Sequence, residues 1–206
     1  AAEAPRQRAP DAAGQGERRG AAGPAGGERE FQSSTKIESL VQELRAMAAA
    51  DASSKALVFS QFVRFLELIE LRLRREGISV AKVEGKLPLA ERSGIIAAFQ
   101  SEPSLKVLLI SLMSGSEGLN LQAADHVFIM DPWWNPASEL QAVQRAYRIG
   151  QTRKVRATRF VAADTIEDKI VELQEKKQSV FDCTIGGSNQ ALQRLTADDI
   201  HFLFSQ

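Results

Sequence analysis

The chain has 206 residues, of which 44% are hydrophobic and 25% charged, enough for one domain with a sizeable core and some appendages. The formal net charge at pH 7 is zero, which excludes a basic field over the whole chain, so any nucleic-acid site must be local. The single cysteine excludes a disulfide within the chain and a zinc site built on cysteines of one chain. No apolar run approaches the ~20 residues of a membrane span, so we expect no membrane partner.

Residues 1–32 differ in composition from the rest of the chain. Up to Glu30 the segment holds alanine, glycine, proline and charged residues, with no branched aliphatic and no aromatic residue. Such a segment cannot bury enough apolar surface to offset the entropy lost on ordering. We therefore predict a disordered linker over 1–32, and favour a plain linker over a partner-binding segment.

Residues 33–185 alternate helical patterns with short apolar runs, and 186–206 form a C-terminal extension with one short helix. The first helix should bury Ile37, Leu40, Val41, Leu44 and Met47, which share one helical stripe. Ser33, Ser34 or Thr35 should cap this helix, and Gly77 should end the helix over 61–77 as a C-cap. In chain order, the patterns predict helix 36–50, strand 56–60, helix 61–77, strand 78–85, helix 88–100, strand 106–111, strand 126–131, helix 136–149, strand 155–161, helix 165–183 and helix 197–205.

Strands of four to seven residues that alternate with helices of about a dozen residues are typical of βαβ units. Right-handed crossovers then give an α/β fold, a parallel sheet with helices on both faces. Ligands bind such sheets beyond the carboxyl ends of the strands, so the functional loops should follow Ser60, Glu84, Ser111 and Asp131.

Two motifs of a complete nucleotidase are absent from the sequence. It has no GxxxxGK[ST] phosphate loop, and no acidic box follows a strand to hold magnesium. We therefore expect this chain alone to be unable to position and activate a nucleoside triphosphate.

Three strand ends carry polar or aromatic residues that suit nucleic acid. Ser60 and Gln61 precede a helix, where they suit an anion or a simple N-cap. The loop SLMSGSEGLNL is small enough for the backbone to approach a phosphate, although a Gly/Ser loop alone is a weak signal. In DPWWNP, adjacent side chains of an extended loop should point apart, which leaves one half-exposed indole for stacking on nucleic acid. The alternative is a pair of packed indoles that pins the loop.

The helix over 136–149 carries two arginines near its end. Asn135 should cap this helix with proline at its first position, and Leu140, Val143 and Tyr147 should face the core. On a helical wheel, Gln141, Arg145 and Arg148 share an exposed face away from these core residues, and the helix should end before Gly150. A guanidinium fork suits phosphate oxygens, so this pair suits an arginine finger that acts on a nucleotide held by another domain. The alternative is a solvated helix face.

Several stretches resemble the second RecA-like lobe of Swi/Snf-type ATP-dependent DNA translocases, over about 34–204. They are KALVFSQF and SLMSGSEGLNLQAADHVFIMDPWWNPASELQAVQRAYRIGQTRKV, and the combination of DxxWNP with RxxRIGQ is specific. The endings ELQEKKQSVFDCTIGG and LTADDIHFLF are similar to the RING-bearing DNA-repair branch, which includes nucleotide-excision-repair and damage-tolerance proteins.

The resemblance implies a RecA-like lobe over 33–185 that works in the nucleus. It implies a first, N-terminal RecA-like lobe in the full-length protein, which holds ATP and Mg²⁺, and leaves a RING finger possible as a further part. The metal would be held by that first lobe and by none of the residues of this chain.

The resemblance also implies roles for individual residues. Arg145 and Arg148 match the arginine fingers. Gly118, Asn120 and Gln151 match nucleotide contacts. The positions that match contacts to double-stranded DNA are Ser60, Gln61, Lys86, Ser111, Ser114, Gly115, Ser116, Trp134 and Asn135.

A few positions depart from the family pattern. Glu117 puts a negative charge beside the expected phosphate path, Gln144 stands where aspartate is common, and Tyr147 stands where histidine is usual. Lys86 takes a place usually held by serine or histidine. Because both fingers are intact, we favour a working lobe. The alternative is a degenerate helicase lobe that docks DNA or protein without turnover.

Overall fold

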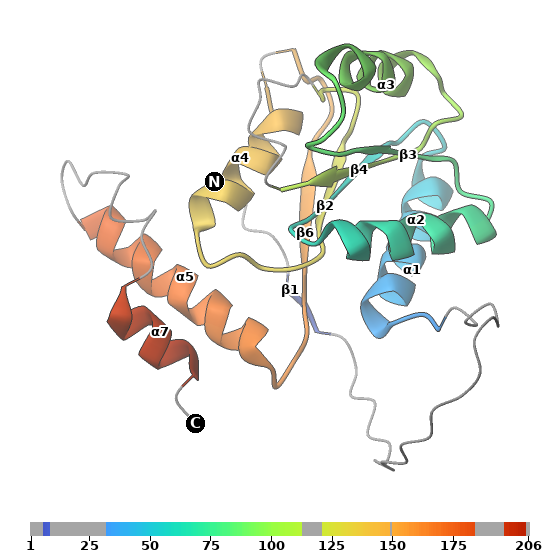
Figure 1. The fold of residues 1–206 in the computed structure, drawn as a ribbon. Helices are drawn as coiled ribbons and strands as arrows, with labels where there is room; N and C mark the ends of the chain where they lie inside the picture. The colour runs from blue at the N-terminus through green and yellow to red at the C-terminus, as the bar shows by residue number, and fades with distance from the viewer. Residues whose placement is uncertain (1–5, 9–31, 113–120, 149, 184–195, 205–206) are drawn as a thin grey trace.

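A computed structural model describes residues 6–8, 32–112, 121–148, 150–183 and 196–204. Its centre is a parallel sheet in the order β1-β6-β5-β2-β4-β3 (Figure 1). The strands are β1 (Arg6–Arg8), β2 (Ala56–Ser60), β3 (Val80–Val83), β4 (Val107–Ser111), β5 (His126–Ile129) and β6 (Arg156–Val161). All of their pairings are parallel, which confirms the predicted α/β architecture.

The short strand β1 lies within the stretch predicted to be a linker. It pairs with the outer edge of β6, with Arg6 opposite Arg159 and Arg8 opposite Val161. An edge strand offers unpaired N–H and C=O groups, so a segment without apolar residues can join it through its backbone alone. The other residues of 1–31 lie outside the described part of the chain, and the disordered linker there stays a prediction.

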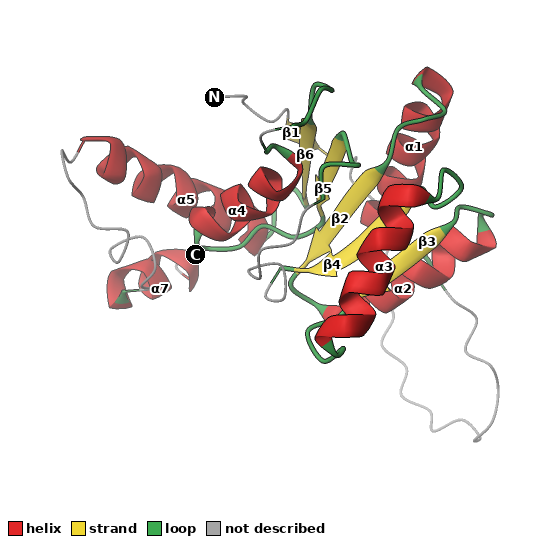
Figure 2. Cartoon of the chain, turned by 90° about the horizontal axis from the view of Figure 1, so that it is seen from above, coloured by secondary structure: helices red, strands yellow, loops and turns green. Residues whose placement is uncertain are grey.

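Helices cover both faces of the sheet (Figure 2). The buried apolar residues of α1 (Thr35–Ala50) and α2 (Val63–Arg75) join one core cluster, and those of α3 (Leu89–Ser101) and α4 (Pro136–Ala146) join the other. Strand β2 belongs to both clusters, with Val58 in the first and Leu57 and Phe59 in the second. A strand buried on both faces explains its uninterrupted apolar run.

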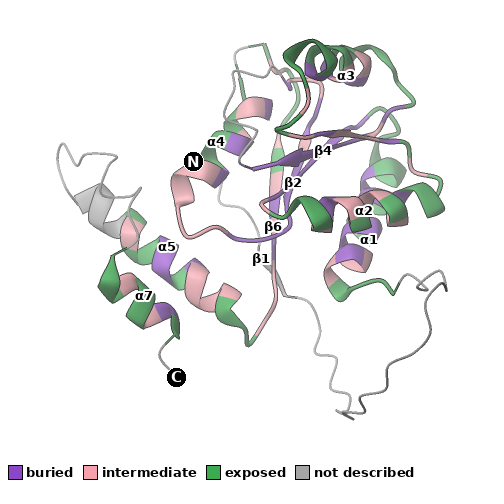
Figure 3. Ribbon diagram, in the orientation of Figure 1, coloured by how far each residue is buried: buried purple, intermediate pink, exposed green. Residues whose placement is uncertain are grey.

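Two further helices, α5 (Ile166–Cys183) and α7 (Ala197–Phe204), lie against each other beyond the sheet layers (Figure 1). Figure 3 shows the contrast in burial, with the central strands buried and the outer turns of the helices exposed. Among the described residues, no helix is both long and apolar enough to cross a membrane.

The local predictions for α1 are confirmed in detail. Its five stripe residues are all buried, and the Ser34 side chain caps the helix by accepting from the N–H of Ile37. Gly77 follows α2 with a positive φ of 74°, as expected for a glycine that ends a helix.

The predicted core face of α4 is wrong. The helix buries Glu139, Ala142 and Ala146, whereas Leu140 is 58% exposed and Tyr147 is 71% exposed. Small alanines let the helix approach the sheet closely, and Glu139 finds charged and polar partners on β6 and α5. Of the three predicted core residues only Val143 packs partly against the core.

Candidate functional site

The carboxyl ends of β2, β4 and β5 meet at one place. The backbone N–H of Leu112 donates to the carbonyl of Ser60 over 2.9 Å, which joins the ends of β4 and β2. The Ser60 hydroxyl donates to Oδ1 of Asp131 over 2.5 Å, and the N–H of Gln61 donates to Oδ2 over 2.8 Å. The structure therefore brings together three of the four predicted loop starts.

These contacts separate the predicted DNA residues into buried and accessible ones. The side chains of Ser60 and Ser111 are buried, so neither lies on the surface, while Gln61 is half-buried. Burial also raises the pKa of Asp131, although the hydrogen bonds from Ser60 and Gln61 oppose that effect. Ser60 and Asp131 thus form the floor of this region, and Gln61 lies above them.

A lysine from α1 ties four elements together at the same end. The ammonium of Lys36 donates to the carbonyl of Met130 over 2.8 Å and to the Glu167 carboxylate over 2.5 and 2.6 Å. Glu167 in turn accepts from the N–H of Ala162 over 2.8 Å. This ion pair fixes the start of α5 against the ends of β5 and β6.

Lys86 lies exposed on the turn after β3. The buried guanidinium of Arg92 braces that turn by donating to the carbonyl of Leu87 over 2.9 Å and to the carbonyl of Gly85. A lysine on a braced turn is a suitable contact for a phosphate, because its ammonium is free to adjust while its backbone is held.

The two tryptophans of the DPWWNP loop do not point apart as predicted. Their ring centroids are 5.8 Å apart at an angle of 46°, and both residues are half-buried. The reason is that other elements fold over the loop, which sequence spacing does not reveal. The ammonium of Lys177 lies 5.2 Å from the centroid of Trp134.

The backbone of this loop is held by buried polar groups that the sequence did not indicate. Oε1 of Glu139 accepts from the N–H of Trp133 over 2.9 Å and from the Gln174 amide over 2.7 Å. That amide also donates to the carbonyl of Trp133. Glu139 forms an ion pair with Arg159 at 2.5 Å, so β6 and α5 both fix the start of α4.

Asn135 caps α4, as predicted. Its side-chain oxygen accepts from the N–H of Ala137 over 3.0 Å, and Pro136 occupies the first helical position. The cap uses the Asn135 side chain within the protein, and a contact between Asn135 and DNA stays a prediction.

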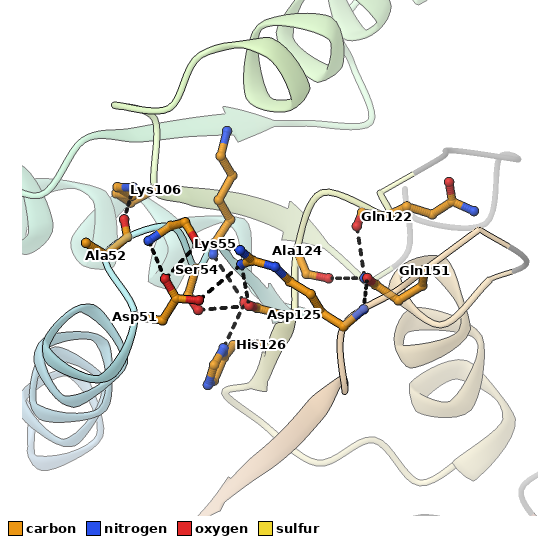
Figure 4. A network of polar contacts seen from close by, with 12 residues as sticks. Asp51, Ala52, Ser54, Lys55, Lys106, Gln122, Ala124, Asp125, His126 and Gln151 are labelled. Carbon is orange, nitrogen blue, oxygen red and sulfur yellow. Dashed lines mark hydrogen bonds and ion pairs between the residues drawn. The ribbon is translucent and has the colours of Figure 1, made fainter.

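The far end of α4 lies at the amino end of the sheet, opposite the strand ends described above. The N–H of Leu121 donates to the carbonyl of Arg145 over 3.3 Å. Figure 4 shows the Gln151 amide reaching the carbonyls of Gln122 and Ala124, each over 2.9 Å. The Gln151 oxygen accepts from the N–H of Arg153 over 2.9 Å. Gln151 therefore holds the RIGQ turn in place, and its contact with a nucleotide stays a prediction.

A buried carboxylate anchors the same end (Figure 4). Asp125 accepts from the Ser54 hydroxyl over 2.8 Å and from the Arg153 guanidinium over 3.0 Å, and His126 is 2.9 Å away. Burial alone would raise the pKa of Asp125, but the contacts with His126, Ser54 and Arg153 hold it below its usual value. The carboxylate is therefore charged and fully engaged.

The predicted exposed face shared by Arg145 and Arg148 does not form. Helix α4 ends at Ala146, and its C-cap residue Tyr147 is non-helical, so Arg148 lies beyond the helix. Arg145 is half-buried and Arg148 is exposed. The turn after Arg148 is closed by the N–H of Gln151 donating to its carbonyl over 3.0 Å, and it uses the positive φ of 104° at Gly150.

Five predicted site residues lie outside the described part of the chain: Ser114, Gly115, Ser116, Gly118 and Asn120. Their segment connects Leu112, at the carboxyl end of the sheet, with Leu121, which bonds to Arg145 at the amino end. Within the described residues, no group of three or more histidine, cysteine, aspartate or glutamate side chains could hold a metal ion.

The comparisons with known proteins agree with this geometry. The family described as the helicase conserved C-terminal domain matches residues 35–150, more than half of the chain. The chain belongs to this family. It is 43% identical over 175 residues to the ATP-dependent helicase rhp16 of Schizosaccharomyces pombe, covering 85% of the chain and 20% of that protein. It is also 36% identical over 178 residues to the DNA repair protein RAD5A of Arabidopsis thaliana, covering 86% of the chain and 17% of that protein.

The fold matches the crystal structure of the C-terminal part of the Fun30 ATPase domain, with a TM-score of 0.68 and 28% identity, over 87% of this chain and 52% of that one. Together these matches confirm the RecA-like lobe of a Swi/Snf-type helicase that the motifs indicated, with relatives named for DNA repair. The chain spans a fifth or less of the length of the two curated relatives.

Proposed function

We propose that this chain is the C-terminal motor lobe of an ATP-dependent double-stranded-DNA translocase that acts in DNA repair or chromatin remodelling in the nucleus. Helicase family membership and the relatives named for DNA repair support this. In this proposal ATP and Mg²⁺ are bound by an N-terminal RecA-like lobe of the full-length protein, and this chain completes the catalytic site.

In this proposal the two ends of the sheet bind different molecules. Duplex DNA lies against the carboxyl end, where the half-buried Gln61 and the 56% exposed Phe62 follow β2 and the exposed Lys86 follows β3. The nucleotide faces the amino end, where α4 ends.

One observation carries the proposal: Arg148 is exposed on a short turn whose backbone is fixed on both sides. Gln151 pins the turn to the residues before β5, and the last turn of α4 bonds to Leu121. A guanidinium held in this way can enter the site of a neighbouring domain and stabilise charge on transferring phosphoryl oxygens. Arg145, half-buried one turn earlier, fits the same role only if its side chain turns outward.

The apolar residues on the outside of α4 also support a neighbouring lobe. Leu140 and Tyr147 are seven positions apart, so they share one side of the helix, and both are more than half exposed. A domain docked over this side would cover both residues and bring its bound nucleotide towards Arg148.

The test uses a protein that contains both lobes. Arg148→Ala should lower DNA-stimulated ATP hydrolysis by about 10³-fold or more, because arginine fingers act on the transition state. The affinity for ATP should change little. Arg148→Lys should also fail, since a lysine lacks the planar fork.

Arg74→Ala is the matched control, because Arg74 is an exposed arginine near the end of α2 that pairs only with Glu70 in the contacts seen for it. Near-normal turnover of Arg148→Ala and of Arg145→Ala would remove the finger role. A two-lobe protein that binds duplex DNA but hydrolyses no ATP would instead favour the docking module, which the charge at Glu117 motivates.

A further inference from the structure

The C-terminal helix α7 is connected to the tryptophan pair through one lysine of α5. The Lys177 ammonium lies 5.2 Å from the centroid of Trp134 and 2.8 Å from Oδ2 of Asp199 on α7. The side chains of Lys177 and Asp199 are only 11% and 16% exposed. A cation within about 6 Å of an indole face is attracted by the ring, and partial burial strengthens that attraction.

Asp199 is held firmly enough to fix that lysine. It forms a reciprocal cap with Thr196: the N–H of Thr196 donates to Oδ2 of Asp199 over 2.9 Å, and the N–H of Asp199 donates to the Thr196 hydroxyl over 3.2 Å. The hydrogen bonds from Lys177 and Thr196 also keep the pKa of Asp199 below its usual value, despite the opposing effect of burial.

Helix α7 itself is docked on α5 by apolar and cation–π contacts. Leu203 is buried, and the ammonium of Lys176 lies 3.6 Å from the centroid of Phe202. The position of Asp199 therefore depends on the docking of the whole helix. Undocking α7 would remove the Asp199 carboxylate from its ion pair with Lys177.

The two indoles differ in what holds them. The backbone of Trp133 is fixed by Glu139 and Gln174, neither of which belongs to α7. Trp134 has Trp133 at 5.8 Å and the Lys177 ammonium at 5.2 Å. A lysine has a long flexible stem, so losing the Asp199 ion pair would hold its ammonium less firmly over the ring.

We propose that Lys177 and Asp199 are positioning residues that hold the Trp134 indole in one orientation, so that docking of α7 sets the aromatic surface offered to duplex DNA. The positioning step rests on geometry within this chain. Its consequence for DNA rests on the proposed function.

The sequence gives a direct optical test of the positioning step. Trp133 and Trp134 are the only tryptophans of the chain, so its intrinsic fluorescence reports on this loop alone. Both core clusters are built entirely from residues of this chain, so the 206-residue protein should fold for this measurement. Asp199→Asn and Lys177→Met should each shift tryptophan emission to longer wavelength and increase quenching by acrylamide.

Asp198→Asn is the matched control, because Asp198 is exposed on the same turn of α7. Asp199→Glu should keep the emission closer to that of the unchanged protein, since it retains the charge. Circular dichroism would verify that every variant is folded. Identical emission and quenching in Asp199→Asn, Lys177→Met and Asp198→Asn would overturn the positioning role.

The DNA consequence is tested separately in the two-lobe protein. Asp199→Asn should weaken duplex binding by roughly 3- to 10-fold, less than Trp134→Ala, which removes a whole stacking group worth about 5- to 150-fold. If emission shifts while the affinity for DNA stays the same in both variants, the DNA surface assigned to Trp134 is wrong and the positioning role stands. If Trp134→Ala weakens binding while Asp199→Asn changes neither readout, the proposed DNA surface stands and the inference fails.

Discussion

The two ends of the sheet use polar residues in opposite ways. At the amino end, Asp125, Arg153 and Gln151 bond to each other's backbone or side chains and to neighbouring carbonyls. At the carboxyl end, a buried pair, Ser60 and Asp131, lies beneath side chains that are accessible. A buried polar group is costly unless it is bonded, so each buried cluster satisfies itself. The polar groups outside these buried clusters are the ones available to bind another molecule.

The contrast between the two ends indicates where the protein needs a rigid backbone. At the amino end the backbone of the exposed Arg148 is locked, which suits chemistry that tolerates little displacement. The accessible groups at the carboxyl end are an exposed lysine, an exposed phenylalanine and a half-buried glutamine, which suit a surface that slides along a polymer. We therefore expect changes at the amino end to affect turnover, and changes at the carboxyl end to affect DNA affinity.

After the loss of Arg148 itself, the largest effect should come from Gln151→Ala in a protein with both lobes. This change removes the two bonds that pin the RIGQ turn to Gln122 and Ala124. A displacement of about 1 Å at a catalytic group can cost about 10²-fold in rate, so DNA-stimulated hydrolysis should fall by about that factor. Steady-state kinetics should show the loss in kcat, with little change in the affinity for ATP.

Gln144→Ala is the control, because Gln144 is exposed on α4, just before Arg145. It should keep most of its turnover. If Gln151→Ala also retains normal kcat, the locked turn does not position Arg148, and the contrast between the two ends of the sheet is lost.

Asp125→Asn should lower the stability of the chain. It leaves the donors of Ser54, Lys55 and Arg153 without their charged acceptor, which should cost about 1.5–3 kcal/mol in the free energy of unfolding at pH 7. Because the pKa of Asp125 is lowered in the folded protein, its stabilisation is present above the ordinary aspartate pKa of about 3.9. It is lost as the pH falls from there through the folded-state value.

Urea unfolding at several pH values measures this effect. The difference between Asp125→Asn and the unchanged protein should be constant from pH 7 to pH 5 and should shrink below about pH 4. Asp51→Asn is the control, since Asp51 is exposed and 3.5 Å from the same arginine, and it should change stability little. A gap that grows as the pH falls below 4 would contradict the charged state assigned to Asp125.

Features with a local cause were predicted well from the sequence. The stripe of α1, the Asn135 cap and the glycine after α2 depend on residues a few positions apart, and the structure has all three. The parallel sheet followed from the order of short apolar runs and helices. In each case the residues whose interaction produces the feature stand close together in the sequence, so their spacing predicts it.

Features with distant partners were not predictable. The sequence placed Leu140 and Tyr147 in the core because they are large and apolar, but α4 buries Glu139 against Arg159 and Gln174 from later elements. The contact between Trp133 and Trp134 was not predicted either, because residues distant in sequence hold that loop. One signal was available: Thr196 and Asp199 have the spacing of a capping box and mark the start of α7, although nothing in that spacing identifies Lys177 as a partner.

The smallest effect compares one lysine at each end of the sheet. Lys86 and Lys154 are both exposed lysines, the first on the turn after β3 and the second just before β6. If duplex DNA lies against the carboxyl end, Lys86→Ala should weaken binding a few-fold and lower the slope of log affinity against log salt by about one. Lys154→Ala should change neither quantity, because no DNA phosphate should approach the amino end. Titrations of labelled duplex at several salt concentrations measure both the affinity and the salt slope. The salt slope is the sharper readout, because a general loss of stability would not lower it by one phosphate contact.

Equal losses from both variants would mean that DNA binding follows the total charge of the lobe. A loss from Lys154→Ala alone would place the DNA at the opposite end of the sheet.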